Sequence, residues 1–103
     1  MKQHNVMQLL KFKNFCESDV DLKELWKKLV KVGFKLRIIQ DELILARFVT
    51  KDKVTSIEKS AEYENKKRAY DQILDSLKAA CNIKNIKVPS FSHEEICDLY
   101  VNF

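Results

Sequence analysis

The sequence predicts an α+β domain of about three to four helices packed on a small antiparallel sheet. Residues 18–32 repeat apolar side chains every three or four positions, as an amphipathic helix does. A single glycine, Gly33, follows this repeat; residues 34–38 then alternate apolar and polar side chains as strands do, and a second apolar run follows over residues 43–49. At 103 residues the chain has the length of one small domain, so we expect residues 1–103 to fold as a single unit.

The helix expected over residues 18–32 has signals for a start and a stop. Ser18 and Asp21 can each accept hydrogen bonds from free backbone N–H groups, and an acidic side chain there favours the positive end of the helix dipole. Gly33 follows where a helix commonly ends in a left-handed residue, which glycine adopts without a Cβ clash. We therefore interpret Gly33 as the stop signal.

The runs FKLRII and LILARFV predict a β-hairpin over residues 34–49, with Gln40, Asp41 and Glu42 between its strands. β-branched and aromatic side chains, which favour strands, dominate both runs. The loop lacks the Asn-Gly or Asp-Gly pair of the tightest turns, so the register stays open. The second run is apolar on both faces, which predicts that it is covered from both sides.

Two further helical segments are expected on either side of this hairpin. Residues 5–16 predict a short helix, with an N-terminal strand or arm as the alternative. Residues 57–81 contain no Gly or Pro and predict either one long helix or two helices joined by a loop. Thr55 or Ser56 is the expected cap at the start of this region.

The C-terminal part combines an extended segment with a last helix. Residues 83–88 are short and β-branched, and they predict a third strand or an extended segment on the hairpin edge. Pro89 ends any regular strand at that point. Ser92 followed by Glu95 is a capping box, which predicts a short helix over residues 93–101.

A core is expected where the apolar faces of these elements meet. The residues assigned to it are Leu22, Leu25, Trp26, Leu29, Phe34, Leu36, Ile38, Phe48, Ile73, Leu74 and Leu77.

Positive charge is concentrated near the N-terminus. Residues 1–37 hold nine Lys and Arg against four Asp and Glu, while the whole chain has a net charge of +4. Such a surface suits phosphate or an acidic protein, although small domains often carry a solvated basic face, and lysines near a helix C-terminus complement its dipole. The candidate phosphate-binding residues are Lys27, Lys28, Lys31, Lys35 and Arg37.

No motif in the sequence pins catalytic groups together. There is no G-x-S-x-G, HExxH or glycine-rich phosphate loop, and the cysteines Cys16, Cys81 and Cys97 form no CxxC pair. His93 and Cys97 stand four residues apart, but two ligands are too few for a closed zinc site. We expect a protein that is not an enzyme and uses no metal or cofactor.

The N-terminus does not resemble a secretory signal, and no run approaches the ~20 apolar residues of a membrane span. Scattered single cysteines are typical of a reducing compartment. We therefore expect an intracellular protein, cytoplasmic or nuclear, with no membrane partner.

Two functional hypotheses follow. The first is a non-catalytic protein-protein interaction module, a subunit or domain of a larger assembly, because apolar residues exceed what one core needs. Its partner would be another protein chain or a second copy of this one. The alternative is a nucleic-acid-binding module that uses the basic face of residues 11–37. The candidate partner-binding residues are Phe12, Phe15, Leu43, Leu45, Tyr100 and Phe103.

Overall fold

The computed structural model describes the backbone of residues 3–102 and the side chains of residues 6–101. This part of the chain folds into helices only, with no strand. The helices are α1 (Gln3–Ser18), α2 (Lys23–Ile44), the short π-helix η1 (Leu45–Val49), α3 (Lys53–Ile83) and α4 (His93–Asn102). The prediction of an α+β fold is therefore wrong, and the molecule is a small bundle of helices.

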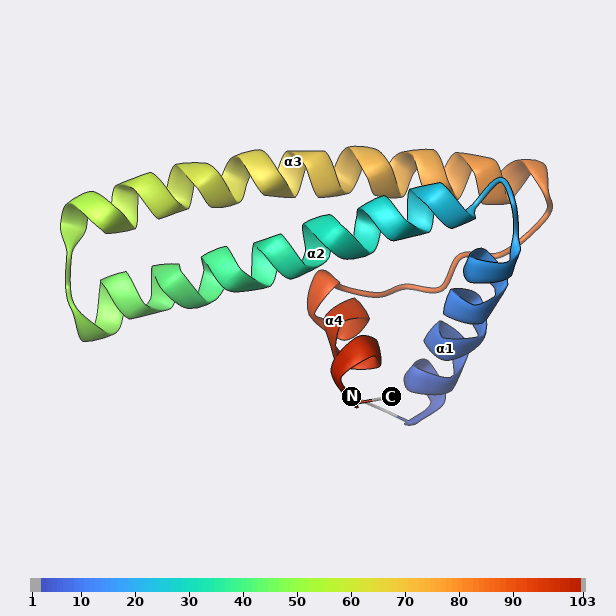
Figure 1. Cartoon of the computed structure of the whole chain (residues 1–103), viewed down its shortest axis with the longest axis horizontal. Helices are drawn as coiled ribbons and strands as arrows, with labels where there is room; N and C mark the ends of the chain where they lie inside the picture. Colours follow the sequence, from blue (N-terminus) through green and yellow to red (C-terminus); the bar gives the residue numbers. More distant parts are fainter. Residues whose placement is uncertain (1–2, 103) are drawn as a thin grey trace.

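Helices α2 and α3 lie side by side and run in opposite directions along the long axis of the molecule (Figure 1). They are joined through η1 at one end, α1 lies near the other end of the pair, and α4 lies beside the middle of α2. The described residues extend over 47 × 27 × 17 Å. We call the four-helix part the body, and the two-helix part beyond it, residues 42–64, the arm.

Helix α2 stays helical through Gly33 because one of its sides carries a heptad repeat, with spacings that alternate between four and three residues. We call these the seam positions, since they face the other helices. The seam positions of α2 are Leu22, Trp26, Leu29, Gly33, Leu36, Gln40 and Leu43, all buried or half-buried.

The β-hairpin predicted over residues 34–49 is wrong, and two seam positions explain the error. Gly33 and Gln40 are not apolar, so the apolar repeat visible in the sequence stops before Gly33, and the next few residues resemble a strand. In the structure Gly33 is buried mid-helix without a positive φ, so it is not a stop signal. Gln40 is accommodated because its Oε1 lies 3.2 Å from His93 Nε2 of α4.

The third strand predicted over residues 83–88 is also wrong, because the described residues offer no sheet edge to pair with. Helix α3 continues to Ile83, and Asn85 then adopts the left-handed conformation with φ 59°. Residues 86–92, which we call the link, have no regular structure and lead back to α4. Ile86 and Val88 of the link are half-buried against the core.

The helix starts are capped by acidic and hydroxyl side chains. Asp19, not Ser18, accepts the N–H groups of Asp21 and Leu22 before α2, at 2.9 and 3.2 Å. The region predicted as one helix or two over residues 57–81 is the single helix α3. Asp52 caps it by accepting from Thr55 N, so Thr55 and Ser56 are not its cap.

The helices expected over residues 5–16 and 93–101 are confirmed as α1 and α4. The capping box of α4 is confirmed as well. Glu95 N donates to Ser92 Oγ at 3.2 Å, and Ser92 N donates to Glu95 Oε1 at 3.0 Å.

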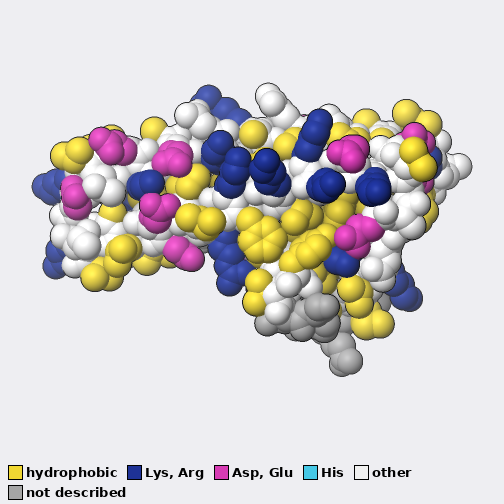
Figure 2. Space-filling model, viewed as in Figure 1, with side chains coloured by type: hydrophobic (Ala, Val, Ile, Leu, Met, Phe, Trp, Pro, Cys, Tyr) yellow, Lys and Arg dark blue, Asp and Glu magenta, His cyan; other side chains and the backbone are white. Residues whose placement is uncertain are grey.

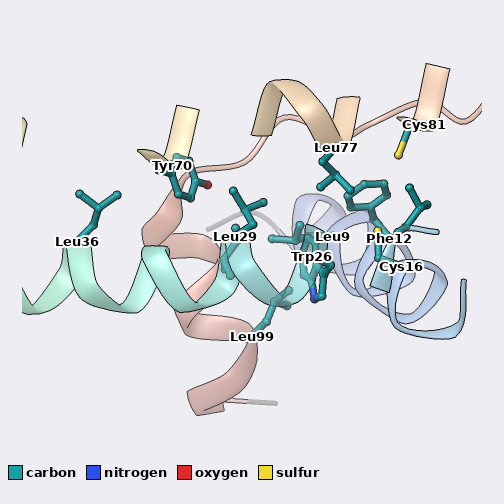
Figure 3. Packing of buried hydrophobic residues seen from close by; sticks show 12 residues of the cluster. Leu9, Phe12, Cys16, Trp26, Leu29, Leu36, Tyr70, Leu77, Cys81 and Leu99 are labelled. Carbon is teal, nitrogen blue, oxygen red and sulfur yellow. The ribbon is translucent and has the colours of Figure 1, made fainter. Parts of the chain in front are cut away.

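Trp26 joins α2 to α1, α4 and the link. Its side chain is 2% exposed, and Figure 3 shows it close to Leu9 and Phe12 of α1. Its ring lies edge-on to Phe12 and Phe91, with centroid distances of 5.7 and 6.2 Å, and its Nε1 donates to Tyr100 Oη at 2.8 Å. One side chain therefore contacts three other segments.

The predicted core is confirmed for its central members. Leu22, Trp26, Leu29, Leu36 and Leu77 are buried. Four others are half-buried: Leu25, Phe34, Ile73 and Leu74. Ile38 and Phe48 are exposed instead, because they lie off the seam of the helical hairpin. The core also includes residues not assigned to it from the sequence, namely Leu9, Phe12, Cys16, Tyr70, Cys81, Ile96 and Leu99.

We predict that Trp26→Ala lowers the free energy of unfolding by about 3–5 kcal/mol, because it removes a buried aromatic side chain and leaves a cavity. Phe48→Ala, at an exposed position, should change it by less than about 0.5 kcal/mol. Urea unfolding followed by circular dichroism at 222 nm measures both. A loss below about 1 kcal/mol for Trp26→Ala would contradict its central position.

Gly33→Ala should stabilise the protein by about 0.5–1 kcal/mol, because alanine favours a helix interior more than glycine does. An added Cβ would lie 3.7 Å from His93 Cβ and 3.8 Å from Tyr70 Cε2, which are ordinary contact distances. Gly33→Leu should destabilise, since there is no room for the larger side chain against α4. The same urea titration measures the free energy of unfolding of both variants. A destabilising effect of Gly33→Ala would contradict an uninterrupted α2.

Candidate functional site

The seam of the arm becomes small and polar toward the turn of the hairpin. The seam of α3 in the body contains Lys67, Tyr70, Leu74, Leu77 and Cys81. The same repeat continued into the arm reaches Tyr63 and then Ser60 and Ser56, where Ser56 Oγ accepts from Arg47 Nε at 3.4 Å. An ion pair between Lys59 and Glu42, 2.9 Å apart, also links the two helices of the arm.

Large apolar side chains lie on the outside of the arm, at the end where the hairpin turns. Phe48 is 72% exposed and Ile57 is 71% exposed. We define the tip patch as Ile44, Leu45, Phe48, Val49, Val54 and Ile57, each about half exposed or more. Yellow apolar atoms appear at this left-hand end in Figure 2, mixed with charged side chains. A cluster of this kind in a small protein is a candidate surface for a partner.

The backbone that carries the tip patch is ordered by hydrogen bonds. Thr50 N donates to Leu45 O, and Asp52 N donates to Ala46 O, each at 2.9 Å. Lys51 turns the chain with φ 53°, and hydrogen bonds from Thr55 hold the pKa of the Asp52 carboxyl below its usual value. The tip patch is therefore presented on a defined turn.

The candidate partner-binding residues lie in different places. Leu45 belongs to the tip patch, whereas Leu43 is half-buried in the seam. Tyr100, 38% exposed, accepts from Trp26 and donates to Glu17 Oε2 at 3.4 Å. Phe103 lies outside the described residues.

Phe12 and Phe15, the other two candidates, are brought together in one groove. The groove has a volume of about 350 Å³ and lies between α1 and the link. Phe12 forms part of the buried core, and Phe15 is 38% exposed. We call this hollow the link groove.

The candidate phosphate-binding residues separate into two groups. Arg37 is paired with Asp98 at 3.4 Å. Lys27, Lys31 and Lys35 follow one another at intervals of four residues on α2, and Lys23 extends the series toward the N-terminus. We call these four residues the lysine row; Lys28 is exposed beside it.

None of the five lysines at positions 23, 27, 28, 31 and 35 forms an ion pair within the described part of the chain. Figure 2 shows basic side chains in a row across the middle of one face, where α2 and α3 lie, with an apolar patch beside them. The positive charge on this face is therefore not neutralised by neighbouring acids.

The buried titratable groups belong to the packing of the core. Burial raises the pKa of the Cys16 thiol to about 12, and it raises the pKa of Cys81 and Cys97 as well. Burial lowers the pKa of His93, whose ring contacts Tyr70 and Gln40. At neutral pH these residues are thus uncharged parts of the interior.

Among the side chains of residues 6–101, no cluster of three or more His, Cys, Asp or Glu could hold a metal ion. None of the helices described is both long and apolar enough to cross a membrane.

Comparisons with protein-family models, with curated proteins and with solved structures gave no significant match. The assignment of function therefore rests on the geometry of the chain itself.

Five residues of the tip patch were missed from the sequence: Ile44, Phe48, Val49, Val54 and Ile57. The sequence did contain one signal for the helical register of this region: Tyr63 and Tyr70 are seven residues apart, and the same interval continues backward to Ser56. Val54 and Ile57 lie off that spacing, so they point away from the seam.

Proposed function

We propose that the protein is a non-catalytic interaction module, a subunit or domain of a larger assembly, that binds another protein chain through the tip patch. The observation that carries the proposal is the distribution of side chains in the outer part of the arm. Beyond Leu43 and Tyr63 its seam on α3 holds Ser60 and Ser56, while the large apolar side chains of the tip patch lie in solvent. A helical arm that buries its apolar side chains only against another molecule explains this arrangement.

The size of the tip patch suits a partner that covers it as a whole. Full burial of one large apolar side chain contributes about 1.5–3 kcal/mol, so a half-exposed one still offers roughly 1–2 kcal/mol. Six such side chains supply on the order of 6–12 kcal/mol. Association costs an estimated 4–15 kcal/mol, so contact with one or two of them would not hold a complex.

We also propose an intracellular location, in the cytoplasm or the nucleus. The support is that Cys16, Cys81 and Cys97 are all free thiols packed in the core. Free buried thiols without a disulfide framework are typical of reducing compartments.

The tip patch predicts a specific cross-link in the cells that make the protein. With benzoylphenylalanine in place of Phe48, ultraviolet light should give one discrete adduct, and Val54→Asp should abolish it by placing a charge in the contact. Val20→Asp is the matched control, because Val20 is 89% exposed in the turn between α1 and α2, far from the tip patch. Gel mobility and mass spectrometry measure the adduct.

The free energy of unfolding of both valine variants should lie within about 0.5 kcal/mol of the parent value, so loss of the adduct would not be due to unfolding. An adduct of two copies of this chain would identify the partner as a second copy. The proposal is contradicted if Phe48 gives no discrete adduct, or if Val20→Asp removes it as effectively as Val54→Asp.

A second candidate function, nucleic-acid binding, is favoured by the lysine row. Like charges four residues apart destabilise a helix by about 0.2–0.5 kcal/mol per pair, and the row contains three such pairs. The helix dipole does not compensate, because α2 continues to Ile44 and the row begins in its first turn. A bound polyanion would relieve this repulsion.

This second function predicts binding that weakens steeply with salt. For labelled single-stranded RNA or duplex DNA, four phosphate contacts give a slope of log K against log salt of about −3. Lys27→Glu with Lys31→Glu should weaken binding at least tenfold, whereas Lys51→Glu with Lys53→Glu makes the same charge change on the distal turn of the hairpin and should have little effect. Fluorescence anisotropy measures both, and equal losses, or no binding at low salt, would exclude the lysine row.

A further inference from the structure

The link groove is a separate surface, in the body rather than at the tip of the arm. One wall comes from α1 and the other from the link, and Lys11 and Lys87 stand on opposite walls. Its volume of about 350 Å³ is at the small end of the ~300–1,000 Å³ usual for ligand sites. The lining residues are Gln8, Lys11, Phe12, Phe15, Ile86, Lys87 and Pro89.

The apolar part of the link groove is held in place from behind. Phe12 is 5% exposed, and its ring packs against Trp26 and against Phe91 of the link, with centroid distances of 5.7 and 6.2 Å. Phe15, one turn further along α1, is exposed beside it. The groove therefore has an ordered apolar floor and an accessible apolar wall, which suit an inserted apolar side chain.

The charges at the link groove are uncompensated, unlike those nearby. Lys13 is paired with Glu17 at 2.8 Å, and Lys84 is paired with Asp21 at 2.9 Å. Lys11 and Lys87 are exposed and form no ion pair with any described residue. Of these four lysines, the two that form no ion pair are thus the two that line the groove.

The link also offers backbone groups to a ligand. The N–H groups of Lys87, Val88 and Ser90 donate to no described residue. Pro89 has no N–H to donate. The carbonyl groups of an extended peptide lying along the link are suitable acceptors for these donors, as with peptides bound at free backbone edges.

We infer that the link groove binds an acidic peptide segment of a partner protein, with a bulky apolar side chain as its anchor. The anchor enters between Phe12 and Phe15, and carboxylates on either side of it pair with Lys11 and Lys87. A peptide fits better than a nucleic acid, because the cations stand singly on opposite walls of an apolar hollow instead of in a row. This site is independent of the tip patch.

Selection from a library of random 12-residue peptides on the intact protein tests the inference. Enriched sequences should carry Asp or Glu around a Trp, Phe, Leu or Ile. A labelled peptide of the enriched sequence should bind at least tenfold more weakly to the variant with Lys11→Glu and Lys87→Glu. The matched control has Lys51→Glu and Lys53→Glu, which make the same charge change, and it should stay within twofold of the parent.

Phe15→Ser provides a second variant whose partly exposed position limits its effect on folding, and it should also weaken binding at least tenfold. Val54→Asp at the tip patch should leave peptide binding unchanged, so the proposals for the two surfaces can be tested separately. The inference is overturned if no peptide is enriched, if the enriched peptides are not acidic, or if both double variants weaken binding equally. If an unlabelled 20-nucleotide RNA displaces the labelled peptide and unlabelled acidic peptides do not, the groove binds nucleic acid instead.

Discussion

The structure depends on the seam of α2, a heptad repeat that begins at Leu22 and continues to Leu43 without a break. Its apolar positions pack against α1, α3 and α4 at once, and Trp26 adds the hydrogen bond to Tyr100 that ties α4 to α2. Helices α3 and α4 both pack beside Gly33, because a Cβ added there would lie 3.8 Å from Tyr70 Cε2 and 3.7 Å from His93 Cβ. Beyond α4, helices α2 and α3 continue as a pair (Figure 1).

That extension forms the arm and separates the tip patch from the core. The seam of the body is filled mainly by large apolar side chains, whereas the outer part of the arm places Ser56 and Ser60 there and exposes Phe48 and Ile57. This outer part buries little apolar surface between its own helices, and it stays ordered because both helices continue from the body. The tip patch is therefore displayed about as far from the core as the chain allows (Figure 1).

The sequence predicts the helices whose signals are local. It predicts secondary structure poorly where tertiary contacts determine the conformation. Capping at Ser92 and the apolar stripe around Leu29 are local, and both predictions are confirmed. Residues 34–49 have strand-like composition, but α3 and α4 stabilise them as helix, and the polar seam residue Gln40 needs His93, 53 positions away, to explain it. Predicting the tip patch requires the helical register of α3, and no residue near Phe48 indicates that register.

The arm exists only if α2 runs as one helix through Gly33 to the turn, so the backbone conformation of residues 34–49 is the central claim. Carbon-13 chemical shifts of the Cα and carbonyl atoms in the free protein measure it residue by residue. We expect helical shifts without interruption from Phe34 to Ile44, continuing into the π-helical turn. Strand-like shifts on either side of Gln40, or a break at Gly33, would contradict the helical hairpin and the tip patch that it carries.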